Sequence, residues 1–250
     1  MMRISFAILT LALLALPAPG EAADDAAGSS RSETSKASQP ASDAKAVGAA
    51  PPTYVLPNVG KPRRRVAGGR RGTADSWPAV YVLVPDHVGL TVSQQPTLYW
   101  YFSEAARGDV VFEVTLIDEE SIEPMVEKRL ATAKPGLQRV RLADYGVTLQ
   151  PDHEYQWSVA LVSDRDRRSR DVVSTGWIER IAEPDDLAAQ LTDAGADGAI
   201  GVYGQAGLWY DLLATAVDLA RGHPDDARYQ RQLTALLAQV GLPESAAEVN

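Results

Sequence analysis

The feature that most constrains the fold is a series of short segments between Trp77 and Ile181 in which apolar and polar residues alternate. Alternation with a period of two is typical of β-strands that bury one face. The segments with this pattern cover residues 79–84, 96–102, 109–118, 124–131, 136–142, 153–162 and 171–181. About seven short strands separated by turn residues predict an antiparallel β-sandwich, in which the more polar segments 124–131 and 136–142 are edge strands.

One stretch refines this prediction. The sequence LQPDHEYQWSV, from Leu149 to Val159, resembles the tyrosine corner of immunoglobulin and fibronectin type III sandwiches. In such a corner the hydroxyl of Tyr155 would bond back to the chain upstream, and Leu149 would face the core. Trp100 and Trp157 are expected to be the large core residues. The predicted fold class is mainly β with C-terminal α, with an immunoglobulin or fibronectin III-like sandwich.

From Glu183 onward the pattern changes to helix, turn, helix, turn, helix. Pro184 lies near the first helix start, and Gly241 and Pro243 end the last helix. The positions that resemble those of a tetratricopeptide repeat are Tyr203, Gly207, Tyr210, Leu219 and Pro224. Only about one and a half repeats are present, and a solenoid needs around three. The helices therefore either pack on the sandwich or on each other, or they form a partner-binding groove.

The N-terminus indicates export. Met1-Met2-Arg3 is followed by the apolar run Ile4–Leu16, and Gly20 and Ala22 suit a cut after Ala22. We therefore expect a signal peptide over residues 1–22 and a periplasmic or secreted protein. Residues 23–60 are rich in Ala, Ser and Pro, which predicts a disordered linker. The chain has no cysteine, which excludes disulfides, thiolate metal sites and a lipoprotein anchor.

Charge is distributed unevenly along the chain. Residues 1–76 hold 10 basic and 6 acidic side chains, whereas residues 77–250 hold 14 and 27. The segment GKPRRRVAGGRRG, from Gly60 to Gly72, contains six Lys or Arg and no carboxylate. Export and the net charge of -9 argue against nucleic acid. A solvated linker, a dock for an anionic surface or polymer, and a segment lying along the acidic domain all remain possible.

The sequence shows no catalytic motif. His87, His153 and His223 lie in a turn, at a strand start and between helices, and no nucleophile or metal-ligand spacing accompanies them. The loop SDRDRRSRD, from Ser163 to Asp171, contains three aspartates that could bind calcium, but four arginines alternate with them. We therefore interpret this segment as a solvated loop that links the last two strands and whose aspartates and arginines pair with one another. No catalytic, cofactor-binding or metal site is therefore predicted, and no cofactor.

The chain as a whole resembles the DUF928 family, exported bacterial proteins of unknown function. The resemblance is carried, in order, by RRRVAGGRRG, LVPDHVGLTVSQQPTLYWYF, VFEVTLIDEE, YQWSVALVSDRDRRSRDVVSTGWIERI and YGQAGLWYDLLATAVDLARGHPDD. It covers about Lys61 to Leu242 and implies no catalytic residue. Family members commonly carry two cysteines near the positions of Thr73 and Ser163, so any bond between them is replaced here by packing and charge. We therefore expect a DUF928-like β-sandwich with a basic Gly-Arg entry segment over residues 61–182, a C-terminal helical region packed on or beside it over 183–242, and a tail over 243–250.

These observations favour an exported, non-enzymatic binding or adaptor protein whose partner is another envelope protein or an anionic envelope polymer. An envelope carbohydrate hydrolase with an unrecognised carboxylate site is the alternative, and it would need two facing carboxylates in an open cleft. Oligomeric state is left open. The candidate interaction residues are Arg63, Arg64, Arg65, Arg70, Arg71, Arg165, Arg167, Arg168, Arg170, Trp209 and Tyr210, and the candidate structural residues are Trp100, Tyr155 and Trp157.

Overall fold

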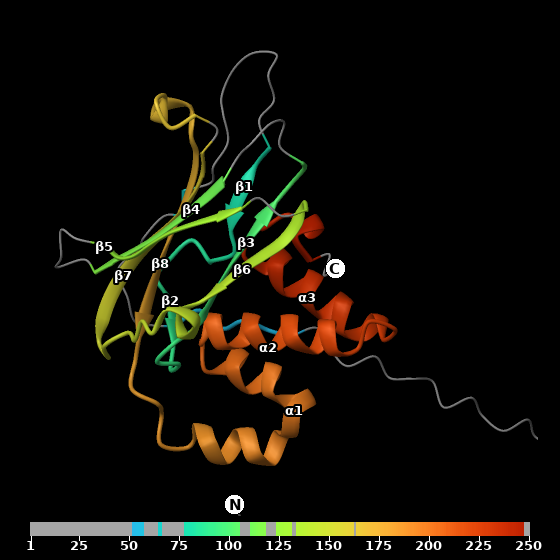
Figure 1. The fold of residues 1–250 in the computed structure, drawn as a ribbon. Helices are drawn as coiled ribbons and strands as arrows, with labels where there is room; N and C mark the ends of the chain where they lie inside the picture. Colours follow the sequence, from blue (N-terminus) through green and yellow to red (C-terminus); the bar gives the residue numbers. More distant parts are fainter. Residues whose placement is uncertain are drawn as a thin grey trace, which may run out of the picture. The chain divides into compact units, whose positions relative to one another are not determined.

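The computed structural model describes residues 52–57, 65–66, 78–105, 111–118, 124–131, 134–162 and 164–247. Within these residues eight strands precede three α-helices (Figure 1). The strands are β1 (Val80–Val82), β2 (Gly89–Thr91), β3 (Thr97–Phe102), β4 (Val111–Asp118), β5 (Pro124–Ala131), β6 (Gly136–Arg141), β7 (His153–Val162) and β8 (Val172–Arg180). The helices are α1 (Leu187–Gln205), α2 (Trp209–Gly222) and α3 (Ala227–Gln239), with short 3-10 turns η1 (Leu142–Tyr145), η2 (Arg168–Arg170) and η3 (Glu244–Ala247). The predicted signal peptide lies outside the described residues.

The strands form two sheets, in the orders β1-β3-β6 and β2-β8-β7-β4-β5. The predicted edge positions of β5 and β6 are confirmed, because each ends its sheet. The prediction of a purely antiparallel arrangement is wrong at one place, where β2 pairs with β8 in parallel. β2 is only three residues long and buried throughout, so it shows no alternation by which the sequence could reveal it.

The core between the two sheets is built from the inward faces that alternation predicts. Trp100 and Phe102 of β3 both meet the ring of Phe112 on β4 edge-on, with centroids 5.5 and 5.0 Å apart. Trp100 and Trp157 are 1% and 0% exposed, so both are core residues as expected. Aromatic pairs in this geometry add to the burial of apolar surface that holds two sheets face to face.

The turn before β7 has the contact expected of a tyrosine corner. The Tyr155 hydroxyl accepts a hydrogen bond from the backbone N–H of Gln150 at 2.9 Å, and Leu149 is fully buried. Asp152, the residue directly before β7, has a φ of 60°, a conformation that Asp tolerates better than most residues. The corner therefore fixes how the chain enters the central strand of the larger sheet.

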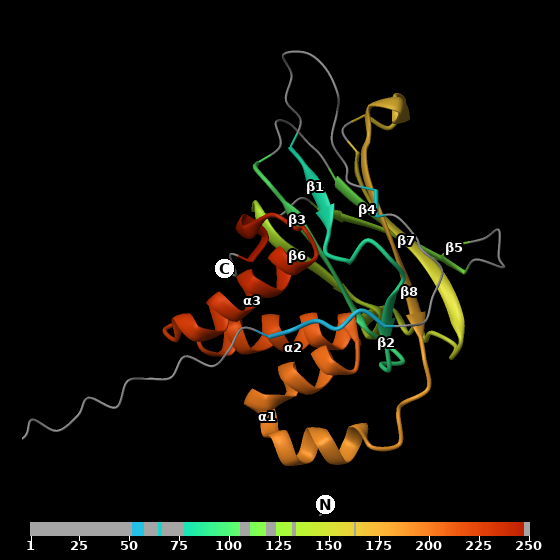
Figure 2. The same ribbon diagram turned by 180° about the vertical axis from the view of Figure 1, so that it is seen from behind.

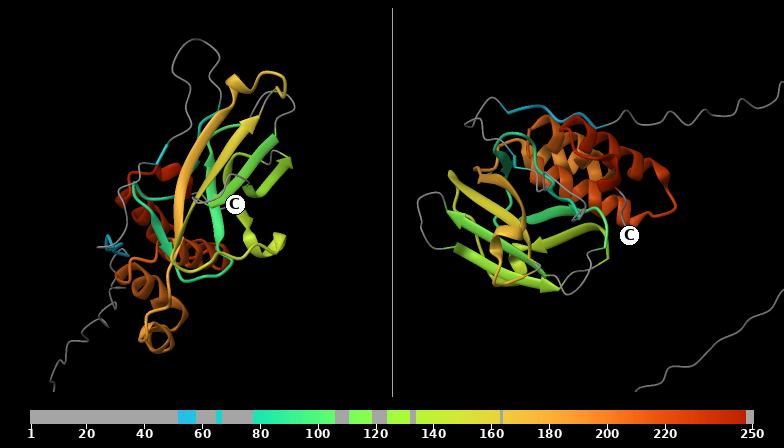
Figure 3. Two further views of the ribbon diagram at one scale, coloured as in Figure 1. Left: turned by 90° about the vertical axis from the view of Figure 1, so that its left-hand side faces the viewer. Right: turned by 90° about the horizontal axis from the view of Figure 1, so that it is seen from above.

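The helices cover the other face of the smaller sheet. Tyr99 and Tyr101, on the face of β3 opposite Trp100, are only 2% and 8% exposed. Asp218 and Arg221 of α2 lie close enough to Tyr99 to affect the pKa of its phenol, which burial raises. The three helices lie together on one side of the sheets (Figure 3), so sheets and helices share one core.

Helix α1 is interrupted at Gly195, whose φ of 66° and ψ of -176° are not helical. Only glycine adopts such a conformation readily, and the two halves of α1 point in different directions (Figure 1). The first half rests on a small second cluster through Leu187, which contacts the group of Leu90 and Leu208. No helix in the described part of the chain is long and apolar enough to cross a membrane.

Replacing Tyr155 by Phe should lower the free energy of unfolding by about 1 kcal/mol, because the Gln150 N–H loses its acceptor while the ring is kept. Urea unfolding measures this, with the partly exposed Tyr81→Phe as the matched control. Equal stabilities of the two variants would show that the corner contributes nothing.

Candidate functional site

The two aromatic residues expected to anchor a partner, Trp209 and Tyr210, lie inside the protein. They are 0% and 2% exposed. The indole N–H of Trp209 donates to the carbonyl of Leu83 at 2.9 Å. The Tyr210 hydroxyl donates to the carbonyl of Trp177 at 2.9 Å and accepts from the indole N–H of Trp157 at 2.8 Å. The prediction that they are exposed anchors is therefore wrong, because the first turn of α2 points its apolar face at the sheets.

The predicted interaction residue Arg65 is also engaged internally. Its guanidinium donates from Nη1 to the carbonyls of Val84, at 2.6 Å, and Val240, at 3.2 Å, and from Nη2 to that of Gly241, at 3.4 Å. Nη2 lies 3.6 Å from the Asp86 carboxylate, and the side chain is 11% exposed. Burial lowers the pKa of Arg65, which the charge of Asp86 opposes. Arg65 thus joins the loop after β1 to the end of α3.

The next residue continues this attachment. Val66 pairs with Thr175 of β8 through two backbone hydrogen bonds of 3.1 and 3.0 Å. The buried hydroxyl of Ser174 donates to the carbonyl of Val66 at 2.9 Å and accepts from the Val82 N–H at 3.0 Å. The described part of the basic segment is therefore part of the fold. The candidate residues Arg63, Arg64, Arg70 and Arg71 lie outside the described residues.

A second N-terminal segment, residues 52–57, lies across the helices, and we call it the strap (Figure 2). Its contacts are mainly from its backbone. The N–H of Val55 donates to the carbonyl of Gly204 at 3.0 Å. The side-chain amide of Gln239 accepts from the N–H of Tyr54 at 2.9 Å and donates to the carbonyl of Pro52 at 2.5 Å. The side chain of Gln239 thus pairs with the backbone on both sides of Thr53.

The ring of Tyr54 fixes the position of the strap. It meets the Trp209 ring edge-on with centroids 5.0 Å apart and stacks on the ring of His87 at 5.8 Å. The Tyr54 hydroxyl lies 3.2 Å from Nε2 of His87. Burial raises the pKa of the Tyr54 phenol, so the hydroxyl stays protonated at all ordinary pH values. Trp209 therefore does serve as an aromatic anchor, for a segment of its own chain.

Two glycines on the helical side allow the strap to approach. A Cβ on Gly204 would lie 2.5 Å from the carbonyl oxygen of Thr53, and one on Gly207 would lie 3.1 Å from that of Val55. Neither distance accommodates a side chain without displacing the strap backbone. We call the residues in contact with the strap, namely His87, Gly204, Gly207, Trp209 and Gln239, the strap site.

A hollow of about 490 Å³ lies beside the strap. It is lined by Tyr54 and Leu56 of the strap, by Pro85, Asp86 and His87 of the loop before β2, and by Gln239, Val240 and Gly241. Leu56 is 71% exposed and Val55 is 39% exposed. The strap therefore buries one large side chain and leaves the next two in contact with solvent.

The arginine-rich stretch between β7 and β8 is self-paired, as its composition suggested. We call residues 164–171 the arginine loop. Arg168 forms two hydrogen bonds to the Glu113 carboxylate on β4, at 2.8 and 3.3 Å, and one to Asp171 at 2.6 Å. Arg129 of β5 adds a third hydrogen bond to Glu113 at 3.2 Å. The sheet thus holds the loop by a forked arginine–carboxylate contact.

The charges around Glu113 stabilise this contact. Hydrogen bonding from Arg168 is the main cause that lowers the pKa of Glu113, and Arg129 assists while burial opposes. A carboxyl whose pKa is lowered by folding adds stability above its unfolded pKa and loses it as the pH falls through the folded one. The contact is therefore present at neutral pH. Arg168 is engaged in this contact although its side chain is 47% exposed, and Arg165, Arg167 and Arg170 are exposed as well.

Asp211, in the first turn of α2, links that helix to the end of β2. Its carboxylate accepts from the N–H of Val92 at 3.1 Å. Burial raises the pKa of Asp211 to about 6, against the opposing effect of the Thr91 hydroxyl and the backbone donors. It borders a cavity of about 190 Å³. The other residues that line this cavity are Ser93, Gln95, Pro96, Thr97, Tyr203, Tyr210, Ala214 and Thr215. Asp211 is the one carboxylate among these described lining residues, whereas glycoside hydrolysis uses two.

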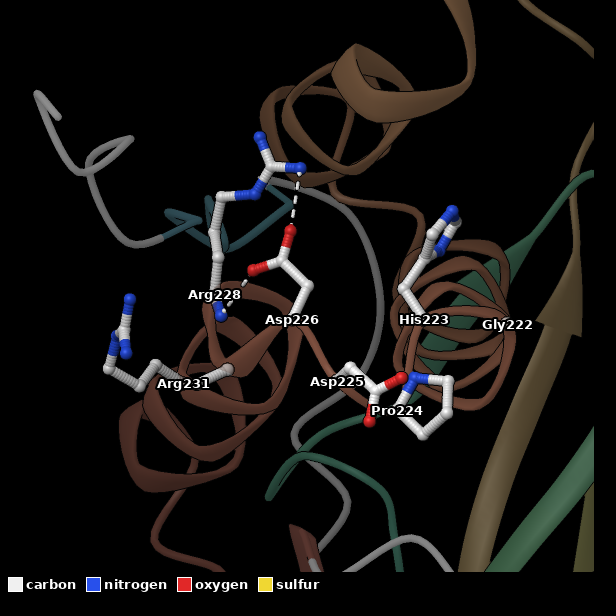
Figure 4. A pocket seen from close by; sticks show the side chains of 8 residues that line it. Gly222, His223, Pro224, Asp225, Asp226, Arg228 and Arg231 are labelled. Carbon is white, nitrogen blue, oxygen red and sulfur yellow. Dashed lines mark hydrogen bonds and ion pairs between the residues drawn. The ribbon is translucent and has the colours of Figure 1, made fainter.

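A more open hollow of about 500 Å³ lies at the turn between α2 and α3 (Figure 4). Its lining includes two neighbouring carboxylates, Asp225 and Asp226. Asp226 caps α3 by accepting from the Arg228 N–H at 2.9 Å, and its other oxygen pairs with the Arg228 guanidinium at 3.2 Å (Figure 4). Asp226 therefore has a structural role at the start of the helix.

The three histidines occupy separate places. His87 lies under the strap, where its Nε2 meets the Tyr54 hydroxyl. Nδ1 of His153 lies 3.6 Å from the Asp118 carboxylate, and Nδ1 of His223 lies 3.1 Å from the carbonyl of Leu219. Within the described ranges, no three His, Asp or Glu side chains come together in a way that could hold a metal ion.

The composition of residues 23–60 predicts one disordered linker, and this prediction is wrong for residues 52–57, which are docked as the strap. The signals that could have identified it are small. Tyr54 is the first aromatic residue after the apolar run of the N-terminus, and it lies between Pro52 and Pro57. The role of Glu113 was also missed, because a charged residue on an outward-facing strand position has no distinctive spacing.

Asp211→Asn should reduce the pH dependence of stability between pH 4 and 7. Because folding raises the pKa of Asp211, the folded state binds more protons there, and stability falls by up to about 3 kcal/mol as the pH rises through this range. Urea unfolding at several pH values measures the difference between variant and wild type. The control is Asp218→Asn, which removes an equal charge at an exposed position of the same helix. Parallel curves of unfolding free energy against pH for the wild type and Asp211→Asn would contradict the prediction.

Comparison with known proteins identifies the family. The family model described as "Domain of Unknown Function (DUF928)" matches residues 66–249. No curated protein matches. Among solved structures, the fn3 domain of the human collagen alpha-1(XX) chain is 14% identical, with 47% of this chain and 93% of that chain covered and a TM-score of 0.27. Astrotactin-2, a vertebrate-specific, perforin-like membrane protein, is 12% identical, with 68% and 37% covered and a TM-score of 0.27. On the family match, which spans most of its length, the chain belongs to the DUF928 family.

Proposed function

We propose that this DUF928 protein is an exported, non-enzymatic binding protein that acts as an adaptor in the periplasm or outside the cell. Its partner would be another exported envelope protein or an anionic envelope polymer. The observation that carries the proposal is the arginine loop. Arg168 fixes the loop on Glu113, and the side chains of Arg165, Arg167 and Arg170 are exposed beside it.

A fixed loop is better suited to binding than a mobile one, because less conformational entropy is lost when a partner binds. Loops at the end of a sheet also commonly carry recognition residues. The Asp164 carboxylate is turned toward its own loop, where it accepts from the Asp166 N–H at 2.9 Å. Its Oδ2 also lies 3.9 Å from Nε of Arg167, so Arg165, Arg170 and the partly paired Arg167 form the cationic part of this loop.

The surrounding charge favours an anionic partner at this loop. Residues 77–250 have 27 acidic and 14 basic side chains, so most of this part of the chain would repel a polyanion. A local group of arginines on an acidic protein both attracts the partner and restricts where it binds. Association of this kind weakens as salt increases.

The finer description of the fold agrees with a recognition role. We take the two sheets to be a sandwich of the immunoglobulin or fibronectin type III kind, on the basis of the Tyr155 corner and of a larger sheet with β7 at its centre. We take α1 and α2 to be a hairpin like that of a tetratricopeptide repeat, on the basis of Tyr203, Gly207 and Tyr210. Both kinds of module are common in binding proteins.

The proposal predicts that Arg165, Arg167 and Arg170, changed together to Gln, will reduce partner capture at least ten-fold. Crosslinking and pull-down from the envelope of the native host measures capture, at low and at physiological salt. The matched control changes three exposed cations elsewhere to Gln, namely Lys134, Arg141 and Arg231. Equal losses in both triple variants would mean that overall charge matters and the loop does not.

The role of Glu113 in holding the loop is tested separately. Glu113→Gln keeps the size of the side chain but removes the charge that Arg168 and Arg129 bind. We expect faster amide hydrogen exchange over residues 165–171 and a smaller loss of capture than in the triple arginine variant. Glu127→Gln, on the exposed face of neighbouring β5, is the control. Unchanged exchange in the loop would contradict this role.

A further inference from the structure

The strap site offers an inference that does not depend on the arginine loop. We propose that it is a peptide-binding site for an extended segment of a partner protein that carries one tyrosine between prolines. Residues 52–57 of this chain would then act as a tethered competitor that occupies the site until the partner displaces it.

The chemistry of the site is that of peptide recognition. The strap is held by three hydrogen bonds from its backbone, made to the carbonyl of Gly204 and to both amide atoms of Gln239. Such bonds do not depend on the identity of the peptide side chains, so another extended chain could form them equally well. The side chains of Val55 and Leu56 are exposed, so they select little for the sequence of a bound peptide.

One pocket supplies the selectivity. Tyr54 is 8% exposed, and its ring lies between those of Trp209 and His87. Its hydroxyl also has a partner in Nε2 of His87. A phenylalanine would fill the same space without that contact, so a tyrosine is favoured.

The helical side of the site is shaped for a close backbone. Gly204 and Gly207 present no side chain where Thr53 and Val55 pass. Pro52 and Pro57 flank the tyrosine and favour an extended conformation before binding, which lowers the entropy cost of docking. These features together define the partner segment as extended, proline-flanked and aromatic.

Occupation by the strap hides the site from a free peptide. A segment joined by a short linker acts at an effective concentration of the order of 1 mM, so it competes strongly with a ligand in solution. A partner must therefore bind more tightly than the strap or be present at high local concentration. Weakening the strap should expose the site.

The test uses the full chain and a fluorescein-labelled peptide of residues 51–58, PPTYVLPN. Tyr54→Ala empties the pocket, and Val55→Pro removes the N–H that donates to Gly204 while Tyr54 remains. By fluorescence anisotropy, we expect both variants to bind the peptide at least ten-fold more tightly than wild type. The same peptide with Ala in place of its tyrosine should not bind.

A matched pair of glycine variants identifies the site of binding. In the Tyr54→Ala background, Gly204→Ala should abolish peptide binding, because its Cβ would lie 2.5 Å from a strap carbonyl. Gly201→Ala, one turn earlier in α1, meets nothing within 4 Å and should leave binding unchanged. Both substitutions replace a glycine of α1 by a better helix former, and apart from an ordinary 3.8 Å contact with Leu212 the added Cβ of Gly204→Ala meets only the strap.

Two results would overturn the proposal. The first is a pair of folded strap variants, as judged by cooperative unfolding, that bind no peptide. The second is a concentration-dependent dimer of the wild type that Gly204→Ala abolishes, seen by analytical ultracentrifugation. That result would make the strap of a second copy the occupant. Either result leaves the arginine-loop experiment unaffected, so the two proposals can fail separately.

Discussion

The arrangement of the molecule depends on two neighbouring aromatic residues at the start of α2. Trp209 bonds to the chain after β1, and Tyr210 bonds to β8 and to the indole of Trp157 on β7. Both sheets and the helical layer therefore meet at one turn of one helix. The fit there is close, because a Cβ on Gly89 of β2 would lie 2.8 Å from the Tyr210 ring. With every buried polar atom of this pair satisfied, the helices have one position on the sheets.

Two surfaces follow from this arrangement, and they differ in how they are held. The arginine loop extends from the larger sheet and is fixed by charge, through Arg168 and Glu113. The strap site lies on the helical side and is fixed by backbone geometry and one aromatic ring. A charged contact is screened as salt increases, whereas backbone hydrogen bonds and the packing of a buried ring are not screened in this way. An adaptor with both could join partners of unlike chemistry.

Much of the fold is predictable from local patterns. Alternation identifies seven of the eight described strands, and the corner of Tyr155 follows from a short motif. β2 escapes because its three residues are all buried, and its parallel pairing joins segments far apart in the sequence. The candidate site is harder to predict from the sequence for a related reason. Trp209 and Tyr210 look like surface anchors until the sheets that cover them are known, and Arg65 looks like a free cation until the carbonyls of Val240 and Gly241 are placed beside it.

The span of the strap contacts has a consequence for the order in which the chain can fold. Tyr54 and its partner Gln239 are separated by 185 positions, so the strap meets that partner only when nearly all of the chain is available. A nascent molecule would carry these N-terminal residues undocked, with Trp209 and His87 not yet covered by Tyr54. Closure of the strap is then a late event that distinguishes a finished molecule from an incomplete one. Loss of Gln239 and the residues after it would therefore undock the strap, although the two lie far apart in the sequence.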